Sequence, residues 1–335
     1  MKKTYYLFNP GRMSRKDHTL KFVATDEQGR SAPPKYLPIQ GLETLYIFGS
    51  IDANSALYNF LGKQRISVHF FDYYEHYSGS FQPKDYLLAG KMQVAQTQAY
   101  LHPEKRMHLA RGLVEGASYN MLKNLRYYDK RKTSLTSIIT PLQKHRDHIS
   151  ACRDIPSLMG IEGNCRQLYY RAFRHIVDGF EMTHRSKQPP SNELNALISF
   201  GNMMCYTLTL DQIYHTQLNP TISFLHEPGA RRYSLALDIA EIFKPILVDR
   251  TIFRLANRKE IRPSHFESKL NGCFLKDSGR KIFIRAFEEK LRETIQHRSL
   301  NKKVSYKHLV KLECYKIAKY ILGIDTDYQA FKIWW

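Results

Sequence analysis

The sequence predicts a two-domain α+β protein, with a small β-rich N-terminal domain followed by a larger helical C-terminal domain. The 335 residues correspond to roughly two domains at about 150 residues each. Short apolar patterns with a period of two dominate up to about residue 80, as expected for strands. After Pro83 the apolar residues recur at helical spacing. We therefore place the domains at residues 1–80 and 84–335.

In the first domain, Leu20, Phe22 and Ala24 alternate with more polar neighbours, which is typical of a half-buried strand. Strands are expected at 4–9, 19–25, 42–48 and 66–72. Between the last two, residues 53–61 form a short helix pattern that Gly62 is expected to end.

The second domain begins with a helical hairpin predicted over residues 85–132, interrupted only at His102-Pro103. Another helix is expected near the end of the chain, with Ser305 as its N-cap and Gly323 just beyond its last turn. Residues 187–191 (KQPPS) read as a loop between helices.

Charge is the strongest compositional signal. The chain carries 51 Lys and Arg against 31 Asp and Glu, a net charge of +20. Residues 81–335 hold 41 of these cations and 24 of the acids, so the excess of +17 belongs to the helical domain. Such an excess favours a polyanionic partner, nucleic acid first and an anionic membrane second. A basic surface without a partner stays open on charge alone.

Other classes lack support. No window reaches 18 uninterrupted apolar residues, and the apolar run near the N-terminus is too short for a signal peptide, so we expect a cytoplasmic protein with no membrane span. The five cysteines contain no CxxC pair, which favours reduced thiols. GxSxG, HExxH, P-loop and GxGxxG motifs are absent.

Chemistry concentrates between Leu218 and Arg250. His226 precedes a Pro-Gly pair, and a helix is expected from Ser234, as its cap, to Phe243, with Pro245 limiting it. Asp238 and Glu241 are three residues apart, so their carboxylates share one helix face. An imidazole with neighbouring carboxylates suits Mg²⁺ or Mn²⁺. A structural histidine and a solvated acidic face explain the same pattern.

Glu162, between two glycines and before a helical run at 167–173, is a possible third ligand. An ordinary first-turn glutamate favoured by the helix dipole is the alternative. His145 and His148 stand in a very basic stretch that is more typical of a surface or phosphate-facing patch than of a metal site.

Several blocks, in order, resemble the CRISPR-associated endonuclease-integrase of the spacer-acquisition machinery, the first-numbered Cas protein. MKKTYYLFNPGRMSRKDHTLKF and LETLYIFGSIDANSALYNFLGKQRISVHFFD resemble its N-terminal domain. GIEGNCRQLYYRAF, PPSNELNALISFGNMMCYTL, LNPTISFLHEPG and SLALDIAEIFKPILVDR resemble its catalytic domain. The ending, with NGCFLKDSGRKIFIRAFEEKL and YQAFKIWW, is most similar to the type I-B branch.

The resemblance implies a metal triad of Glu162, His226 and Glu241, with Asp238 as the second choice for the last acid. These residues would hold Mg²⁺ or Mn²⁺ and act in catalysis. Ser223, Asn202 and Glu227 depart from the family pattern, and none of these departures removes a ligand.

The implied fold is an N-terminal β-sandwich-like domain, which dimerises, and a larger all-α C-terminal catalytic domain. The implied function is insertion of short foreign DNA fragments into a CRISPR repeat by attack of a 3′-hydroxyl. The implied assembly is a homodimer, two of which bridge a dimer of the small ferredoxin-like second-numbered Cas protein in a 4:2 complex. A branched-DNA repair nuclease and a non-catalytic nucleic-acid platform stay open as other functions.

Four cations near the triad are expected to hold DNA phosphates. They are Arg231, Arg232, Lys244 and Arg250. A solvated surface position explains each of them equally well.

Overall fold

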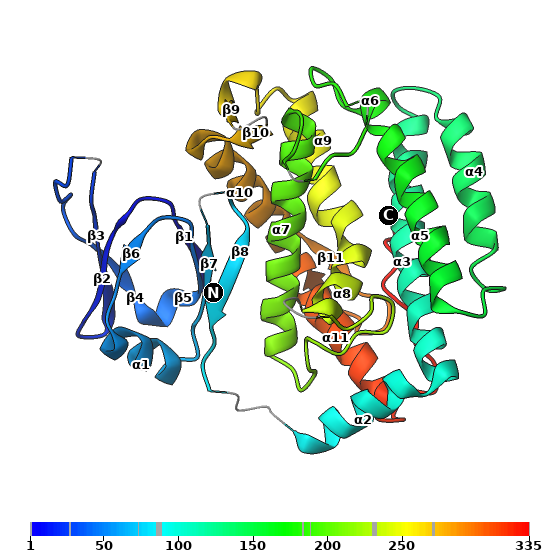
Figure 1. Ribbon diagram of the computed structural model, residues 1–335, viewed down its shortest axis with the longest axis horizontal. Helices are drawn as coiled ribbons and strands as arrows, with labels where there is room; N and C mark the ends of the chain where they lie inside the picture. Colours follow the sequence, from blue (N-terminus) through cyan, green and yellow to red (C-terminus); the bar gives the residue numbers. More distant parts are fainter. Residues whose placement is uncertain are drawn as a thin grey trace. The chain divides into compact units, whose positions relative to one another are not determined.

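The chain forms two compact units, Met1–Leu88 and Ala89–Trp335. The structure is a computed structural model that describes residues 2–26, 28–72, 74–84, 89–182, 184–187, 189–229, 233–269 and 272–334. The N-terminal unit is built from strands, and the C-terminal unit is mostly helical, which confirms the predicted fold class (Figure 1).

The N-terminal unit contains two four-stranded sheets. One has the order β1 (Lys3–Leu7), β5 (Leu42–Ile47), β7 (Ser67–Phe71), β8 (Tyr77–Phe81), with its first three strands parallel and β8 antiparallel. The other has the order β4 (Lys35–Pro38), β3 (Thr19–Ala24), β2 (Gly11–Lys16), β6 (Ile51–Asp52). The four predicted strands are confirmed as β1, β3, β5 and β7, and β2, β4, β6 and β8 join them.

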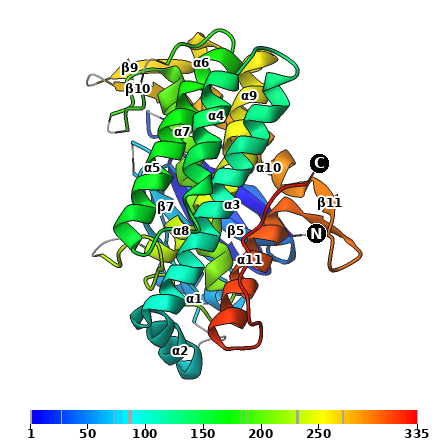
Figure 2. The same ribbon diagram turned by 90° about the vertical axis from the view of Figure 1, so that its right-hand side faces the viewer.

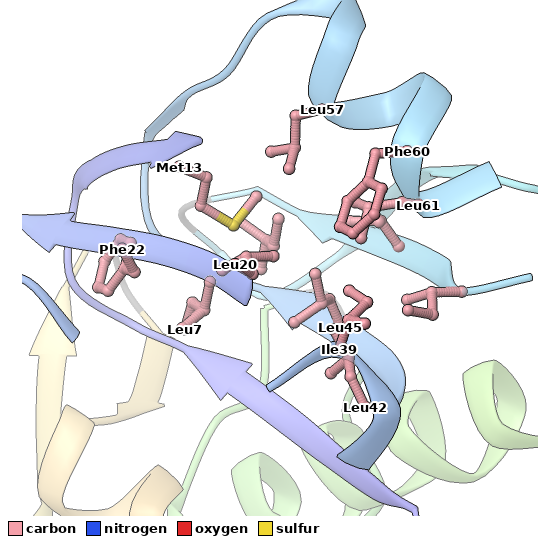
Figure 3. Packing of buried hydrophobic residues seen from close by; sticks show 13 residues of the cluster. Leu7, Met13, Leu20, Phe22, Ile39, Leu42, Leu45, Leu57, Phe60 and Leu61 are labelled. Atoms are coloured by element: carbon pink, nitrogen blue, oxygen red, sulfur yellow. The ribbon is translucent and has the colours of Figure 1, made fainter. Parts of the chain in front are cut away.

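The core of this unit lies between the two sheets. Figure 3 shows Met13 and Leu20 from one sheet facing Leu45 from the other, and Phe60 of helix α1 closing the same cluster. Each such side chain, when fully buried, contributes about 1.5–3 kcal/mol through the hydrophobic effect. This packing of sheet on sheet is the β-sandwich-like arrangement that the resemblance implied.

Helix α1 (Ser55–Lys63) joins β6 to β7. The Asn54 side chain caps it by accepting a hydrogen bond from the Leu57 N–H at 3.1 Å. The helix therefore starts two residues later than predicted, and Gly62 lies inside it instead of ending it.

The C-terminal unit is a bundle arranged around the long helix α3. Its helices are α2 (Gly90–Leu101), α3 (Pro103–Asp129), α4 (Thr136–Asp147), α5 (Ile155–Arg171), α6 (Phe173–Ile176), α7 (Glu193–Tyr214), α8 (Ser234–Lys244), α9 (Arg250–Asn257), α10 (Asp277–Arg292) and α11 (Tyr306–Ile321). Helix α3 packs against α4, α5 and α8, and α8 packs against α7 (Figure 2). This unit also contains two small antiparallel hairpins. One pairs β9 (Phe266–Lys269) with β10 (Gly272–Leu275), and the other pairs β11 (Thr294–Gln296) with β12 (Lys303–Ser305).

The predicted hairpin corresponds to α2 and α3, which His102-Pro103 separates. The part of this prediction at residues 85–88 lies outside the described residues. The Ser305 hydroxyl caps α11 through the His308 N–H at 3.2 Å, and Gly323 has φ +70°, so both predicted ends of that helix are confirmed.

Helical structure continues through Pro245, contrary to expectation. Residues Pro245–Asp249 form a π-helical segment that connects α8 to α9 without a break (Figure 1). Proline lacks the N–H that an α-helix needs, and a wider turn accommodates this loss. Asn124 and Asn120 on α3 support the segment by donating to the carbonyls of Pro245 at 2.6 Å and Ile242 at 2.9 Å.

Ser234 is the first residue of α8 and not its cap. Its hydroxyl instead donates to the Thr221 carbonyl at 2.9 Å, which joins the start of α8 to the loop that precedes it. Within the described ranges, no helix is both long and apolar enough to cross a bilayer.

Candidate functional site

The loop that carries His226 is held by one buried carboxylate. Asp238 on α8 is fully buried, and its Oδ2 accepts hydrogen bonds from the N–H groups of Phe224 at 2.7 Å and Leu225 at 3.0 Å. Its Oδ1 accepts from the N–H of His226 at 3.0 Å and lies 2.8 Å from Nδ1 of the same residue. Asp238 therefore fixes both the backbone and the ring of His226.

The bond to Asp238 also determines which ring nitrogen of His226 is left for chemistry. A carboxylate only accepts hydrogen bonds, so Nδ1 carries the proton and donates it. The lone pair of the neutral ring is then on Nε2. This arrangement of carboxylate, imidazole and free nitrogen is the one that metal-binding histidines use in proteins.

Glu162 and Glu241 meet at one guanidinium group. Arg166, one turn after Glu162 on α5, donates to Glu162 Oε1 from Nε at 2.7 Å, and its Nη2 also bonds to Glu241 on α8. The Lys244 ammonium donates to the other oxygen of Glu241 at 2.5 Å. Glu162 lies in the middle of α5 and not in a first turn, so the helix dipole does not explain its position.

The charges of these groups act on one another. Burial lowers the pKa of His226, but Asp238, Glu241 and Glu162 together raise it above its ordinary value. Burial raises the pKa of Glu241, but Arg166 and Lys244 outweigh this effect and hold it at about 2. Both glutamates therefore lie within electrostatic reach of the imidazole, and Glu241 is ionised at neutral pH.

These side chains suit a hard divalent cation. Carboxylate oxygens and one imidazole nitrogen are the donors that Mg²⁺ and Mn²⁺ accept. The Arg166 guanidinium already provides a positive charge between the two carboxylates, where a divalent cation would neutralise them. With that guanidinium in place, the described ranges contain no cluster of three or more His, Cys, Asp or Glu side chains arranged around a metal position.

The predicted phosphate-binding residues differ in position. Lys244 is buried beside Glu241, so it is not a solvated cation. Arg250 lies further along the same helix, with its guanidinium carbon 4.9 Å from the centre of the Tyr127 ring. Arg231 and Arg232 lie outside the described residues. Burial raises the pKa of Cys165 to about 12, so this buried thiol is not an activated nucleophile.

Sequence reasoning missed Arg166, although its spacing of four residues from Glu162 is a usable signal. It also missed Gln96 on α2, which no local pattern marks. The fully buried Gln96 side chain donates to the carbonyls of Asn219 at 3.0 Å and Ile222 at 2.8 Å, and accepts from the Asn219 N–H at 2.9 Å. The histidine loop is therefore held by two helices: α2, which precedes it in the chain, and α8, which follows it and carries Asp238.

Gln96→Leu is expected to destabilise the fold by about 2–4 kcal/mol, because it removes the partners of the Asn219 N–H and the Ile222 carbonyl and leaves the Asn219 carbonyl only the Ile222 N–H at 3.4 Å. Urea denaturation would measure the loss. The matched control is Gln98→Leu, an exposed position on the same helix, where a change within about 0.5 kcal/mol is expected. Equal stabilities for the two variants would show that Gln96 does not support the loop.

A buried carboxyl lies behind the site. Asp249, on the π-helical segment, is 3% exposed and hydrogen bonds to the Tyr169 hydroxyl, which accepts in turn from Asn124 at 2.9 Å. Burial raises the pKa of Asp249 to about 7, against the opposing effects of Tyr169, Arg166 and Lys244. Asp249 therefore holds its proton to a much higher pH than an exposed aspartate does.

Asp249→Asn is expected to stabilise the fold by about 2–3 kcal/mol more at pH 8 than at pH 5. The folded chain binds the Asp249 proton more tightly than the unfolded chain does. The contribution of this carboxyl to the free energy of unfolding therefore falls as the pH rises from about 4 through the folded pKa. Denaturation curves at the two pH values would measure the difference. The exposed Asp277→Asn provides the control, and a pH-independent effect of Asp249→Asn would contradict the expectation.

Fold and site together define a two-domain protein with a β-sandwich-like unit, and a helical unit in which two glutamates share one guanidinium group within electrostatic reach of a histidine. The family model described as CRISPR associated protein Cas1 matches residues 5–289, and the chain belongs to this family. The resemblance inferred from the sequence is thereby confirmed at the level of the family, while the type I-B branch stays a prediction.

Curated relatives cover the full chain. A protein named CRISPR-associated endonuclease Cas1 3 from Thermodesulfovibrio yellowstonii is 45% identical over 99% of this chain and 100% of its own. A CRISPR-associated endonuclease Cas1 from Fusobacterium nucleatum is 40% identical over 100% of this chain and 98% of its own.

Solved structures share the fold. A Cas1 protein from Thermotoga maritima aligns with a TM-score of 0.85 and 36% identity, over 98% of this chain and 100% of its own. A casposase bound to its integration product also reaches 0.85, over 98% of this chain and 93% of its own. At 17% identity, that second likeness shows the fold alone.

Proposed function

We propose that this chain is a metal-dependent DNA endonuclease and integrase that inserts short DNA fragments into a CRISPR repeat. The observation that carries the proposal is that Glu162 and Glu241 share one guanidinium group and that both raise the pKa of the nearby His226. Relatives named CRISPR-associated endonuclease support the nuclease activity. The casposase structure with its integration product supports strand transfer on this fold.

Glu162, Glu241 and Nε2 of His226 would hold the Mg²⁺ or Mn²⁺. The bound cation supplies Lewis acidity to the phosphate and charge stabilisation to its oxygens. Asp238 keeps the His226 lone pair on Nε2, and Arg166 and Lys244 bring positive charge to the entering phosphate. Asp238 acts here as a positioning residue and not as a ligand.

The reaction is a transesterification. The 3′-oxygen of the fragment forms a new bond to a repeat phosphorus, and the bond from that phosphorus to the repeat's own 3′-oxygen breaks. The proton of the attacking hydroxyl leaves and the departing 3′-oxygen gains one, so the number of phosphodiester bonds does not change. With water as the attacking group, the same arrangement cuts DNA.

The partners follow from charge and from structural likeness. A net charge of +17 over residues 81–335 suits DNA. A chain of a structure titled as a complex of Cas6-RT-Cas1 with Cas2 has this fold, with a TM-score of 0.80, 18% identity, and alignment over 100% of this chain and 36% of its own. We propose the small second-numbered Cas protein as the partner, with a homodimer of this chain in a 4:2 complex.

Strand transfer tests the function. The purified protein and its small partner would be mixed with a short labelled DNA and a supercoiled plasmid carrying a repeat array. Joining is expected with Mn²⁺ or Mg²⁺ and a free 3′-hydroxyl. A 3′-deoxy end should abolish joining and leave DNA cleavage unaffected.

Joining in EDTA would contradict the metal role. Cleavage of branched DNA without any joining would favour a repair nuclease, and binding without chemistry under any metal would favour a non-catalytic platform.

A further inference from the structure

Beyond α11 the chain turns back and runs along α3 as an extended segment (Figure 2). We refer to residues 328–334 as the return segment. It belongs to no helix or strand, yet four of its side chains are buried: Tyr328, Ala330, Phe331 and Ile333. Buried backbone without regular structure must find its hydrogen-bond partners among side chains. The contacts of the return segment therefore show what it holds in place.

Two glycines on α3 make room for the return segment. A Cβ atom added at Gly112 would lie 2.8 Å from the Tyr328 ring, and one added at Gly116 would lie 2.6 Å from the Cβ of Ala330. Glycine weakens the interior of a helix, but here it allows a close approach of the chain. A larger residue at either position would push the segment away from α3.

Asn120, one turn after Gly116 on α3, joins the return segment to α8. Its fully buried side chain accepts from the Ile333 N–H at 2.9 Å and donates to the carbonyls of Phe331 at 3.1 Å and Ile242 at 2.9 Å. Ile242 directly follows Glu241, one of the proposed metal ligands. One amide group therefore binds the return segment and the ligand-bearing turn of α8 at the same time.

The Phe331 ring makes a second contact with α8. It stacks on Phe243, two residues after Glu241, with ring centres 5.5 Å apart and ring planes inclined by 13°. The segment is fixed from its other side by the fully buried Glu313 of α11, which accepts from the Phe331 N–H at 3.1 Å and from the Tyr328 hydroxyl at 2.6 Å. Helices α3 and α11 thus hold the segment against α8.

The turn of α8 that carries Glu241 needs support from outside the helix. In an α-helix the Glu241 carbonyl would accept from the N–H of residue 245, but Pro245 has no N–H. The next turn is π-helical. Because this turn lacks one of its regular hydrogen bonds, the contacts of Asn120 and Phe331 help to determine where the Glu241 side chain begins. Metal ligands function only when they are held within about 0.5 Å of their place.

We propose that the return segment is a positioning element of the metal site, which fixes the Glu241 turn of α8 through Asn120 and Phe331. The inference rests on the proposed function, because it concerns the metal ligand named there. It goes further by assigning a role to a segment that contributes no ligand. Displacement of the segment should weaken metal binding although every ligand is retained.

Gly116→Ala tests the inference, because the added Cβ pushes the segment off α3. This variant should bind Mn²⁺ about 10- to 100-fold more weakly than the wild type, which is the usual loss when a group that supports a metal ligand is changed. Adding Ala330→Gly removes the clashing Cβ, so the double variant should recover most of the affinity. Electron paramagnetic resonance of free Mn²⁺, recorded well below the melting temperature of each variant, measures the affinity.

The matched control is Gly90→Ala at the start of α2, where an added Cβ has no atom within 4 Å. It should bind Mn²⁺ as the wild type does. Phe331→Leu is a second variant, which keeps an apolar side chain and removes the stacking on Phe243, and a loss of about 2- to 10-fold is expected. Its control is Phe180→Leu, which removes one ring of the Phe180–Phe266 pair and should lower the melting temperature without changing Mn²⁺ affinity.

Hydrogen exchange in EDTA provides a readout that needs no metal. The backbone amides of residues 235–244 should exchange faster in Gly116→Ala and in Phe331→Leu than in the wild type and the two controls. The double variant with Ala330→Gly should return toward the wild-type rate. Mass spectrometry of peptides from α8 measures this exchange.

Wild-type Mn²⁺ affinity in Gly116→Ala and Phe331→Leu would overturn the inference, even if their melting temperatures fell, because a merely structural segment would give that result. Unchanged exchange of α8 in both variants would also overturn it. If the wild type bound no Mn²⁺ but exchange of α8 still followed the segment, the proposed metal site would fail, while the hold of the segment on the Glu241 turn would be supported.

Discussion

Replacing His226 by alanine is expected to reduce DNA strand joining about 10³-fold or more. The substitution removes Nε2, the only uncharged donor in the proposed ligand set, and a metal's contribution of several kcal/mol corresponds to three or more powers of ten in rate. It also leaves the buried Asp238 carboxylate without its imidazole partner.

A gel assay for joined strands, run with Mn²⁺ and the partner protein, measures this loss. The matched control is His175→Ala, an exposed histidine on α6, which should join strands at the wild-type rate. Joining by His226→Ala within about tenfold of the wild type would keep the proposed reaction but contradict the proposed metal site.

Asp238→Ala is expected to lower the free energy of unfolding by about 3–5 kcal/mol and the melting temperature by about 10 °C. The side chain accepts from three consecutive backbone N–H groups in addition to the His226 ring, and all of these donors are at least partly buried. Without the carboxylate, the loop has no internal acceptor for them. Thermal unfolding followed by circular dichroism measures the change.

Asp238→Asn separates two roles that the sequence left open for this residue. The amide keeps one acceptor oxygen but places an NH₂ group against other donors. If Asp238 is a positioning residue, the metal-free variant should therefore show a clear loss of thermal stability. If Asp238 were the ligand in place of Glu241, Mn²⁺ affinity would fall while the metal-free stability stayed the same. The second outcome would contradict the positioning role.

Much of the fold could be predicted because many of its helices and strands are determined by residues close together in the sequence. Period-two strands such as Thr19–Ala24, and the cap at Ser305, depend on neighbours within a few residues. Short strands such as β4 and β6 have too few residues for an alternation of apolar and polar side chains to be recognised in the sequence. Pro245 misled the prediction because its effect depends on Asn124, a residue 121 positions away that supports the wider turn.

The site follows the same division. His226, Asp238 and Glu241 lie within sixteen residues of sequence, so spacing alone brought them together. Glu162 is on a different helix, and only the resemblance connected it to the others. Gln96 contacts the histidine loop more than 120 positions later in the chain, and no pattern within a single sequence reports such a pairing.

Binding of Mn²⁺ itself decides whether these residues form a metal site. Electron paramagnetic resonance detects free Mn²⁺, and the signal should fall as the wild-type protein binds about one ion per chain. We expect affinity to weaken at least about tenfold in His226→Ala and in Glu241→Gln, and to be retained in the exposed control Glu181→Gln. Equal Mn²⁺ binding by all four proteins, or none by the wild type, would contradict the proposed site.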